Sequence, residues 1–217
     1  MFQDRRDAGR TLARIVAKTR DLHDGIVLGL PRGGVPVAYE VACQLNLPLD
    51  VFIVRKLGVP GEEELAMGAV ASGGTVVINP SIVHHLGISP EVVQAAVQRE
   101  EVEIERRERA YRNGYPPVRV ADRTAILVDD GLATGATMLA AARALRPKTE
   151  RVIVAVPVSA ERTCNELRGE VDEVICANTP EHFFAVGAFY RDFTQTTDEE
   201  VRSLLSQARK RHGLQVA

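Results

Sequence analysis

The fold is decided by the stretch Ile126-Leu127-Val128-Asp129-Asp130-Gly131-Leu132-Ala133-Thr134-Gly135-Ala136-Thr137-Met138. It begins with an apolar run, continues with two acids and a turn that contains two glycines, and ends in residues that favour a helix. This order predicts a buried strand, a turn and a helix. Because ligands of open parallel sheets bind at the carboxyl ends of the strands, the acids and the turn are the first candidates for a functional site.

The rest of the chain alternates short apolar runs with helical patterns. The apolar runs lie at 25–29, 49–54, 75–78, 124–128 and 152–156, and the helical patterns at about 4–20, 34–45, 135–146, 160–168 and 197–211. Near-continuous Val, Ile and Leu content is typical of parallel strands covered on both faces. We therefore predict one α/β domain over residues 1–217, with a doubly wound, mostly parallel sheet flanked by helices.

Residues 79–122 interrupt this alternation. Ser89-Pro90-Glu91 is a typical helix start, and the helix is expected to run to about Arg112. Its apolar stripe consists of Val93, Val97, Ile104 and Tyr111. Acid and base pairs at i,i+4 predict a solvated opposite side, and they are Glu103 with Arg107, Glu105 with Arg109, and Glu108 with Arg112. We predict a helical insertion that packs over one edge of the sheet or against a partner subunit.

Composition is that of an ordinary globular protein. Of 217 residues, 26% are charged and 45% hydrophobic, and the 27 basic and 29 acidic side chains are mixed along the chain. This pattern predicts no nonspecific binding to nucleic acid. No apolar run approaches the ~20 residues that span a bilayer, and the first residues lead into no secretory segment. We therefore expect a cytoplasmic protein that binds neither nucleic acid nor membrane.

The cysteines and histidines give no metal or disulfide pattern. Cys43, Cys164 and Cys176 are odd in number, widely spaced and without a C-x-x-C, so reduced, packed thiols are expected. His84 and His85 are neighbours, and neighbouring helical side chains point about 100° apart. A metal site formed by these two histidines is therefore not expected.

The decisive stretch has the chemistry of a sugar phosphate site. Free amides at a helix start favour an anion, and Thr134 and Thr137 add hydroxyl donors. Ionised Asp129 and Asp130 only accept hydrogen bonds, so they must face hydroxyls or a cation. A phosphate in the turn and ring hydroxyls on the acids satisfy both halves. The alternative is structural, because Asp and Gly are also ordinary turn residues at the end of a strand.

These residues resemble the phosphoribosyl pyrophosphate signature of type I phosphoribosyltransferases, in which apolar residues, two acids and a short turn precede Thr-Gly-x-Thr. The resemblance implies that Asp129 and Asp130 hold the ribose 2- and 3-hydroxyls. It also implies Mg²⁺ as cofactor, bound mainly through the substrate and assisted by these two acids rather than by a dedicated set of protein ligands. The residues implied to hold the 5-phosphate are Gly131, Ala133, Thr134, Gly135, Ala136 and Thr137.

Two further segments are similar to the family's pyrophosphate-binding parts. Arg32-Gly33-Gly34 follows an early strand without the G-x-G-x-x-G spacing of a dinucleotide site, and Arg32 would be a charge-assisted donor. Arg55 and Lys56 enter a Gly- and Pro-containing segment similar to the mobile loop that closes over the reacting sugar. A surface turn and exposed strand-end charges are the structural alternatives. The resemblance assigns catalytic roles to Arg32, Lys56, Asp129 and Asp130.

The acceptor is less specified. Ala133 stands where 6-oxopurine enzymes of the family carry an acid, which disfavours hypoxanthine or guanine as acceptor. The turn is most similar to adenine phosphoribosyltransferases, and orotate enzymes also lack the acid. The variable hood that covers the acceptor is expected within 176–196. Aromatic residues gather there, either to stack on a planar acceptor or simply to pack in the core.

The resemblance implies a magnesium-dependent phosphoribosyltransferase. The reaction transfers the phosphoribosyl group of 5-phosphoribosyl 1-pyrophosphate to a nitrogenous base or related acceptor and releases pyrophosphate. The partners implied are these small molecules and a second copy of the chain, because dimers are common in the family. The alternative is a regulatory module on the same fold that senses 5-phosphoribosyl 1-pyrophosphate or a nucleotide without turnover.

Overall fold

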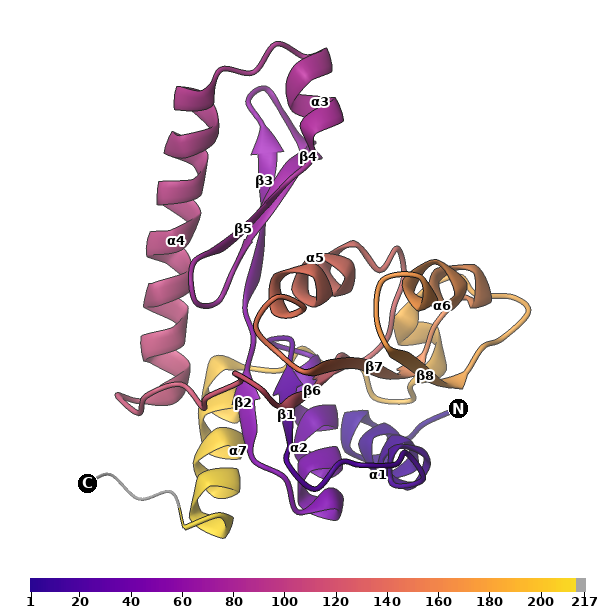
Figure 1. Cartoon of the computed structure of the whole chain (residues 1–217). Helices are drawn as coiled ribbons and strands as arrows, with labels where there is room; N and C mark the ends of the chain where they lie inside the picture. The colour runs from indigo at the N-terminus through magenta and orange to yellow at the C-terminus, as the bar shows by residue number, and fades with distance from the viewer. Residues whose placement is uncertain (214–217) are drawn as a thin grey trace.

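The protein is built around a parallel sheet with strand order β2-β1-β6-β7-β8 (Figure 1). The computed structural model describes residues 1–213, so the last four residues of the predicted domain lie outside the described part. The sheet strands are β1 (Gly25–Gly29), β2 (Leu49–Val51), β6 (Thr124–Val128), β7 (Arg151–Val158) and β8 (Glu173–Asn178). Within residues 1–213, no helix combines the length and the apolar character needed to cross a bilayer.

Helices cover both faces of this sheet. The flanking helices are α1 (Arg5–Val16), α2 (Gly34–Leu45), α5 (Ala136–Leu145), α6 (Glu161–Arg168) and α7 (Asp198–Arg211). Alternate strand residues enter two separate cores: Ile126 and Val128 pack on the side of α1, α2 and α7. Leu127 and Ala125 pack on the side of α5 and α6. The predicted doubly wound, mostly parallel sheet is confirmed, and it contains one strand, β8, that the apolar pattern did not indicate.

A second, antiparallel sheet projects from the first as an arm (Figure 1). The arm consists of β3 (Val54–Val59), β4 (Glu62–Ala71), β5 (Thr75–Ile78), α3 (Pro80–His85) and α4 (Pro90–Arg112). The prediction that 75–78 is a parallel strand of the main sheet is wrong. Gly61, Gly73 and Gly74 have positive φ angles, and the short turns that they form bring consecutive strands back antiparallel without a crossover helix. The predicted strand 49–54 is likewise divided between the two sheets.

Helix α4 has the predicted bounds but not an entirely solvated outer side. Arg109 pairs with its i,i+4 acid at 2.8 Å in an exposed position, as expected. Arg112, in contrast, is buried, with its Nε 2.9 Å from the carboxylate of Asp50 and its Nη1 3.1 Å from Glu108. Asp50 lies on β2 and is 1% exposed. A buried acid needs a charged partner, so this ion pair ties the base of the arm to the edge of the parallel sheet.

Candidate active site

The central strand β6 delivers the two acids to the edge of the sheet. All five of its residues are buried, between β1 on one side and β7 on the other. Asp129 and Asp130 follow directly, and both residues are half-buried at the edge of the sheet. The acids therefore leave the core at the carboxyl end of the strand, as the sequence predicts, and they are not turned into the core.

The turn after the acids is pinned to the neighbouring strand. The amide of Leu132 donates to the carbonyl of Val158 at 3.0 Å, and Leu132 also forms an isolated parallel bridge with Ser159. A Cβ on Gly131 would lie 2.6 Å from a methyl of Val186, so glycine is needed for this close approach. The backbone of the turn is thus held in place on two sides.

Beyond this anchor the turn opens to solvent. Its exposed or partly exposed residues are Ala133, Thr134, Gly135, Ala136 and Thr137. Gly135 caps α5 at its start with a φ of 71°, a left-handed conformation that glycine adopts without strain. The first amides of a helix have no intrahelical acceptor, and they carry the positive end of the helix dipole. An exposed turn that leads into such a helix is suited to bind a phosphate.

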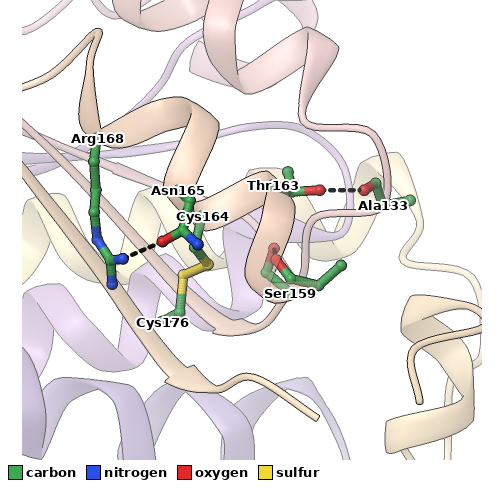
Figure 2. The surroundings of a disulfide bond; sticks show 8 residues. Ala133, Ser159, Thr163, Cys164, Asn165, Arg168 and Cys176 are labelled. Carbon is green, nitrogen blue, oxygen red and sulfur yellow. Dashed lines mark hydrogen bonds between the residues drawn. A yellow bond between two sulfur atoms is a disulfide. The ribbon is translucent and has the colours of Figure 1, made fainter. Parts of the chain in front are cut away.

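Helix α6 braces the turn from behind (Figure 2). The hydroxyl of Thr163 donates to the carbonyl of Ala133 at 2.9 Å, and a Cβ on Gly135 would lie 2.7 Å from the Thr163 methyl. The next residue, Cys164, forms a disulfide with Cys176 of β8. The support of the turn is therefore covalently joined to the last strand of the sheet.

This disulfide corrects the prediction of three reduced thiols. Cys164 and Cys176 are 12 residues apart in sequence, a spacing that fits no short cysteine motif. They meet because β8 follows α6 and returns to pair with β7. Cys43, on α2, remains free.

The two acids have unequal electrostatic surroundings. Burial, and then the charge of Asp130, raise the pKa of Asp129 well above its usual value. Burial also raises the pKa of Asp130, but Arg5 opposes that rise through a contact of 2.8 Å between its Nε and Oδ2 of the acid. Among residues 1–213, Asp129 has no ion pair, and its Oδ1 accepts only from the Asp130 amide at 2.9 Å. One cation thus faces two acids, which leaves room for hydroxyl donors or for a metal-bearing ligand.

The turn between β1 and α2 lies against the same acids. A Cβ on Gly33 would lie 2.1 Å from Oδ2 of Asp130, and a Cβ on Gly34 would lie 2.8 Å from the Cα of Asp129. Both glycines are therefore required for the two turns to approach each other. The predicted pyrophosphate segment and the predicted ribose acids are consequently brought together.

Arg32 is the exposed member of that turn. The peptide bond between Pro31 and Arg32 is cis. The guanidinium lies 3.6 Å from the carboxylate of Asp198, at the start of α7, and the Arg32 side chain is 40% exposed. A long, solvated ion pair of this kind contributes little stability, so the side chain can leave it for an anionic ligand at small cost.

The two predicted cations of β3 diverge. Arg55 turns toward α4, where its Nε is 2.8 Å from a carboxylate oxygen of Glu100. Lys56 lines a cavity of about 380 Å³ between the arm and α5, together with Thr137 and Arg143. Neighbouring residues of a strand point to opposite faces, so of these two cations the structure brings only Lys56 toward the start of α5.

Aromatic side chains gather where the N-terminal segment meets the predicted hood. Phe183 stacks on Phe189 with centroids 5.6 Å apart, and Tyr190 lies 5.5 Å from Phe2 and 5.0 Å from Phe193. Phe2 is joined to this segment by a parallel bridge to Tyr190. Because most of these rings pack against each other, they serve core packing rather than stacking on an acceptor.

Comparison with known proteins agrees with this geometry. Residues 2–194 match the family described as "Phosphoribosyl transferase domain". The chain belongs to the phosphoribosyl transferase domain family. Two Mycobacterium tuberculosis proteins, "Putative phosphoribosyl transferase Rv0571c" and "Putative phosphoribosyl transferase MT0597", are each 44% identical over 211 residues, 97% of this chain. Those residues are 47% of each relative, so the chain spans about half the length of these curated proteins.

A solved structure is similar to this phosphoribosyl transferase domain over nearly its whole length. The protein TT1426 from Thermus thermophilus is 41% identical, with a TM-score of 0.85, and the match covers 95% of this chain and 98% of that one. The predicted resemblance to type I phosphoribosyltransferases is thereby confirmed. The choice of acceptor and the roles of single residues remain predictions.

Two residues of this phosphoribosyl transferase domain that contact the acids were not predicted. Besides the contact of Arg5 with the side chain of Asp130, the hydroxyl of Tyr190 donates to the main-chain carbonyl of Asp130 at 2.5 Å. Arg5 belongs to no motif and lies 125 residues from its partner. Tyr190 is one of several aromatic residues within 176–196. No local signal in the sequence indicates either contact.

Proposed function

We propose that this domain is a magnesium-dependent phosphoribosyltransferase, which transfers the phosphoribosyl group of 5-phosphoribosyl 1-pyrophosphate to a nitrogenous acceptor. In this reaction the bond from ribose C1 to the pyrophosphate oxygen breaks and a bond from C1 to nitrogen forms. The acceptor loses a proton, and pyrophosphate leaves. One observation carries the proposal: an exposed, helix-capped turn lies beside two acids at the exit of the central strand.

The substrate is divided among three segments. The 5-phosphate binds the turn at Gly131 and residues 133–137, through main-chain amides and the threonine hydroxyls. The ribose hydroxyls donate to Asp129 and Asp130, which only accept hydrogen bonds when ionised. Pyrophosphate lies along residues 32–34, which abut the acids, and is met by Arg32 and by Lys56, whereas Arg55 is held by Glu100 on α4. Fixing the sugar by both ends orients C1 for attack.

Magnesium fits the composition of this site. Carboxylate oxygens are ligands that Mg²⁺ prefers, and this ion commonly reaches proteins through one or two acids and substrate phosphates. Within the described residues no cluster of three or more His, Cys, Asp or Glu is placed to hold a metal. When bound, the ion would neutralise the charge that develops on the departing pyrophosphate.

The acceptor side belongs to residues 176–196, which we propose as the hood. Phe184 is 88% exposed, so its ring remains available to stack on a planar base. Ala133 at the turn argues against an acceptor that needs an acid there, and a base of the adenine type fits better. We also propose a cytoplasmic protein that forms a homodimer, with the arm formed by residues 54–112 as the candidate contact.

The test measures pyrophosphate release from 5-phosphoribosyl 1-pyrophosphate and magnesium with a panel of nitrogenous bases. Release with one base is expected, and Asp130→Asn should abolish most of it with little loss of fold. Asp122→Asn is the matched control, because Asp122 precedes β6 at the opposite end of the same strand. Saturable binding without release for any base would identify a sensor instead. Absence of binding would refute a phosphoribosyl pyrophosphate site altogether.

A further inference from the structure

Arg5 occupies a junction that no motif indicates. It is the first residue of α1, and its guanidinium makes three contacts with two distant parts of the chain. The Nε is 2.8 Å from Oδ2 of Asp130, one terminal nitrogen donates to the carbonyl of Thr194 at 2.7 Å, and the group lies 4.0 Å from the ring centroid of Phe193. The contacts join the N-terminal helix, a ribose acid and the predicted hood.

The junction is enclosed. The side chains of Arg5 and Asp130 are 11% and 14% exposed. The place where Gly33 lacks a Cβ lies 2.1 Å from Oδ2 of Asp130 and 3.3 Å from Nε of Arg5, so any larger residue would separate the pair. An ion pair with so little water is held in one geometry, unlike an exposed pair.

The contacts fix Asp130 from both sides. Its main-chain carbonyl accepts from Tyr190, and one of its carboxylate oxygens accepts from Arg5. A carboxylate offers about four lone-pair positions, so the second oxygen remains able to accept from a ligand. The direction of that oxygen is set by the hydrogen bond that Arg5 makes to the first.

We propose that Arg5 is a positioning residue, which orients Asp130 so that the site selects sugar phosphates carrying the ribose diol. This inference rests on the proposed function and adds a determinant of sugar specificity to it. A purely structural ion pair would stabilise the fold and affect all phosphate ligands alike. A positioning residue affects only the part of the affinity that the sugar hydroxyls contribute.

The experiment measures that part directly. Calorimetry gives the dissociation constants of ribose 5-phosphate and of its 2-deoxy and 3-deoxy forms for the wild-type chain, Arg5→Met, Arg5→Lys and Arg6→Met. The wild type should prefer the full diol by about tenfold, as expected for one hydrogen bond to a charged group. Arg5→Met should reduce that preference to less than about twofold, a loss of one such bond, while the deoxy sugars bind as before. Arg5→Lys keeps the charge without the fork and should recover part of the preference.

Arg6 supplies the matched control. It is the next residue of the same helix and pairs with Glu40 at 2.6 Å, away from the acids, so Arg6→Met should keep the wild-type preference. An unchanged diol preference in Arg5→Met, or an equal loss for all three sugars, would overturn the positioning role alone. A wild-type chain that shows no diol preference would overturn the proposed ribose site, and the role of Arg5 with it.

Discussion

Opening the disulfide between Cys164 and Cys176 is expected to destabilise the protein by about 3 kcal/mol. The two cysteines are 12 residues apart. In the chain-entropy model, closing a loop of that size removes roughly 9.5 cal/mol/K from the unfolded chain, which is about 2.8 kcal/mol at 25 °C. For a protein of this size, such a change corresponds to a fall in Tm of about 6–12 °C.

The assay compares thermal unfolding of the wild type with and without a dithiol reductant. Cys176→Ser is the preferred variant, since Cys176 is partly exposed whereas Cys164 is fully buried. Serine at the buried position would also leave a hydroxyl in the core. The reductant should lower the Tm of the wild type to that of Cys176→Ser and leave the variant unchanged. Cys43→Ser, which alters the free cysteine, should respond to the reductant as the wild type does.

The same variant tests the support of the turn that we propose to bind the 5-phosphate. Thr163, which holds the carbonyl of Ala133, precedes the disulfide by one residue. The hydrogen bond is worth about 1 kcal/mol, so its loosening should weaken the binding of 5-phosphoribosyl 1-pyrophosphate by up to about fivefold. Equal Tm values in the oxidised and reduced states would refute the stabilising role of the disulfide. A lower Tm of Cys176→Ser with unchanged affinity would show that α6 braces the turn without the disulfide.

Three further perturbations have defined outcomes. Asp129→Asn should raise the free energy of unfolding at neutral pH, because burial raises the pKa of this carboxyl and its charge therefore costs stability. In urea denaturation at decreasing pH, the difference between variant and wild type should shrink and vanish below about pH 4, where the aspartate is protonated in the unfolded chain as well. Gly135→Ala should lower the free energy of unfolding, measured by chemical denaturation, by about 1–3 kcal/mol and should weaken phosphate binding. Gly114→Ala is the control: Gly114 also has a positive φ but has open space around it, so this variant should leave phosphate binding unchanged. Arg112→Met should cost about 3–5 kcal/mol in the same assay, because buried Asp50 loses its 2.9 Å partner and keeps the longer, 3.9 Å ion pair with Arg209. Adding Asp50→Asn should recover part of that loss.

Apart from β8, the parallel half of the fold follows from local sequence, because strands β1, β6 and β7 are each followed along the chain by a turn and a helix of their own. An apolar run of about five residues is followed by a turn and a helix, as in β6, the turn after it and α5. The arm is different. Residues 75–78 have the composition of a buried parallel strand, and only the glycine turns that precede them decide that they pair backward instead. A pattern of apolar residues does not carry that information, whereas the turn residues do.

The site was predictable to the extent that it is local. The acids and the turn after them belong to one stretch, and the structure places both at the exit of β6, where the sequence predicts them. The divergence of Arg55 and Lys56 follows from strand alternation once β3 is located. The contact between Arg5 and Asp130 has no such basis. It depends on the crossing of two turns at Gly33 and on the path of residues 189–194, which are properties of the assembled fold.

The two acids differ in whether a cation is paired with them, and this difference affects both stability and ligand binding. Arg5 offsets part of the cost of burying the charge of Asp130 and fixes its side chain before any ligand arrives. Asp129 has no such partner among the described residues, and burial disfavours its charge. A site with both acids paired to cations would be more stable, but its carboxylates would bind hydroxyls or a metal-bearing substrate less strongly. Because Asp129 lacks a cation of its own in the described part of the chain, its desolvation cost is recovered only when a ligand supplies the missing donors. The rise in Tm that saturating ligand produces should therefore include a contribution from Asp129, and that contribution should disappear in Asp129→Asn.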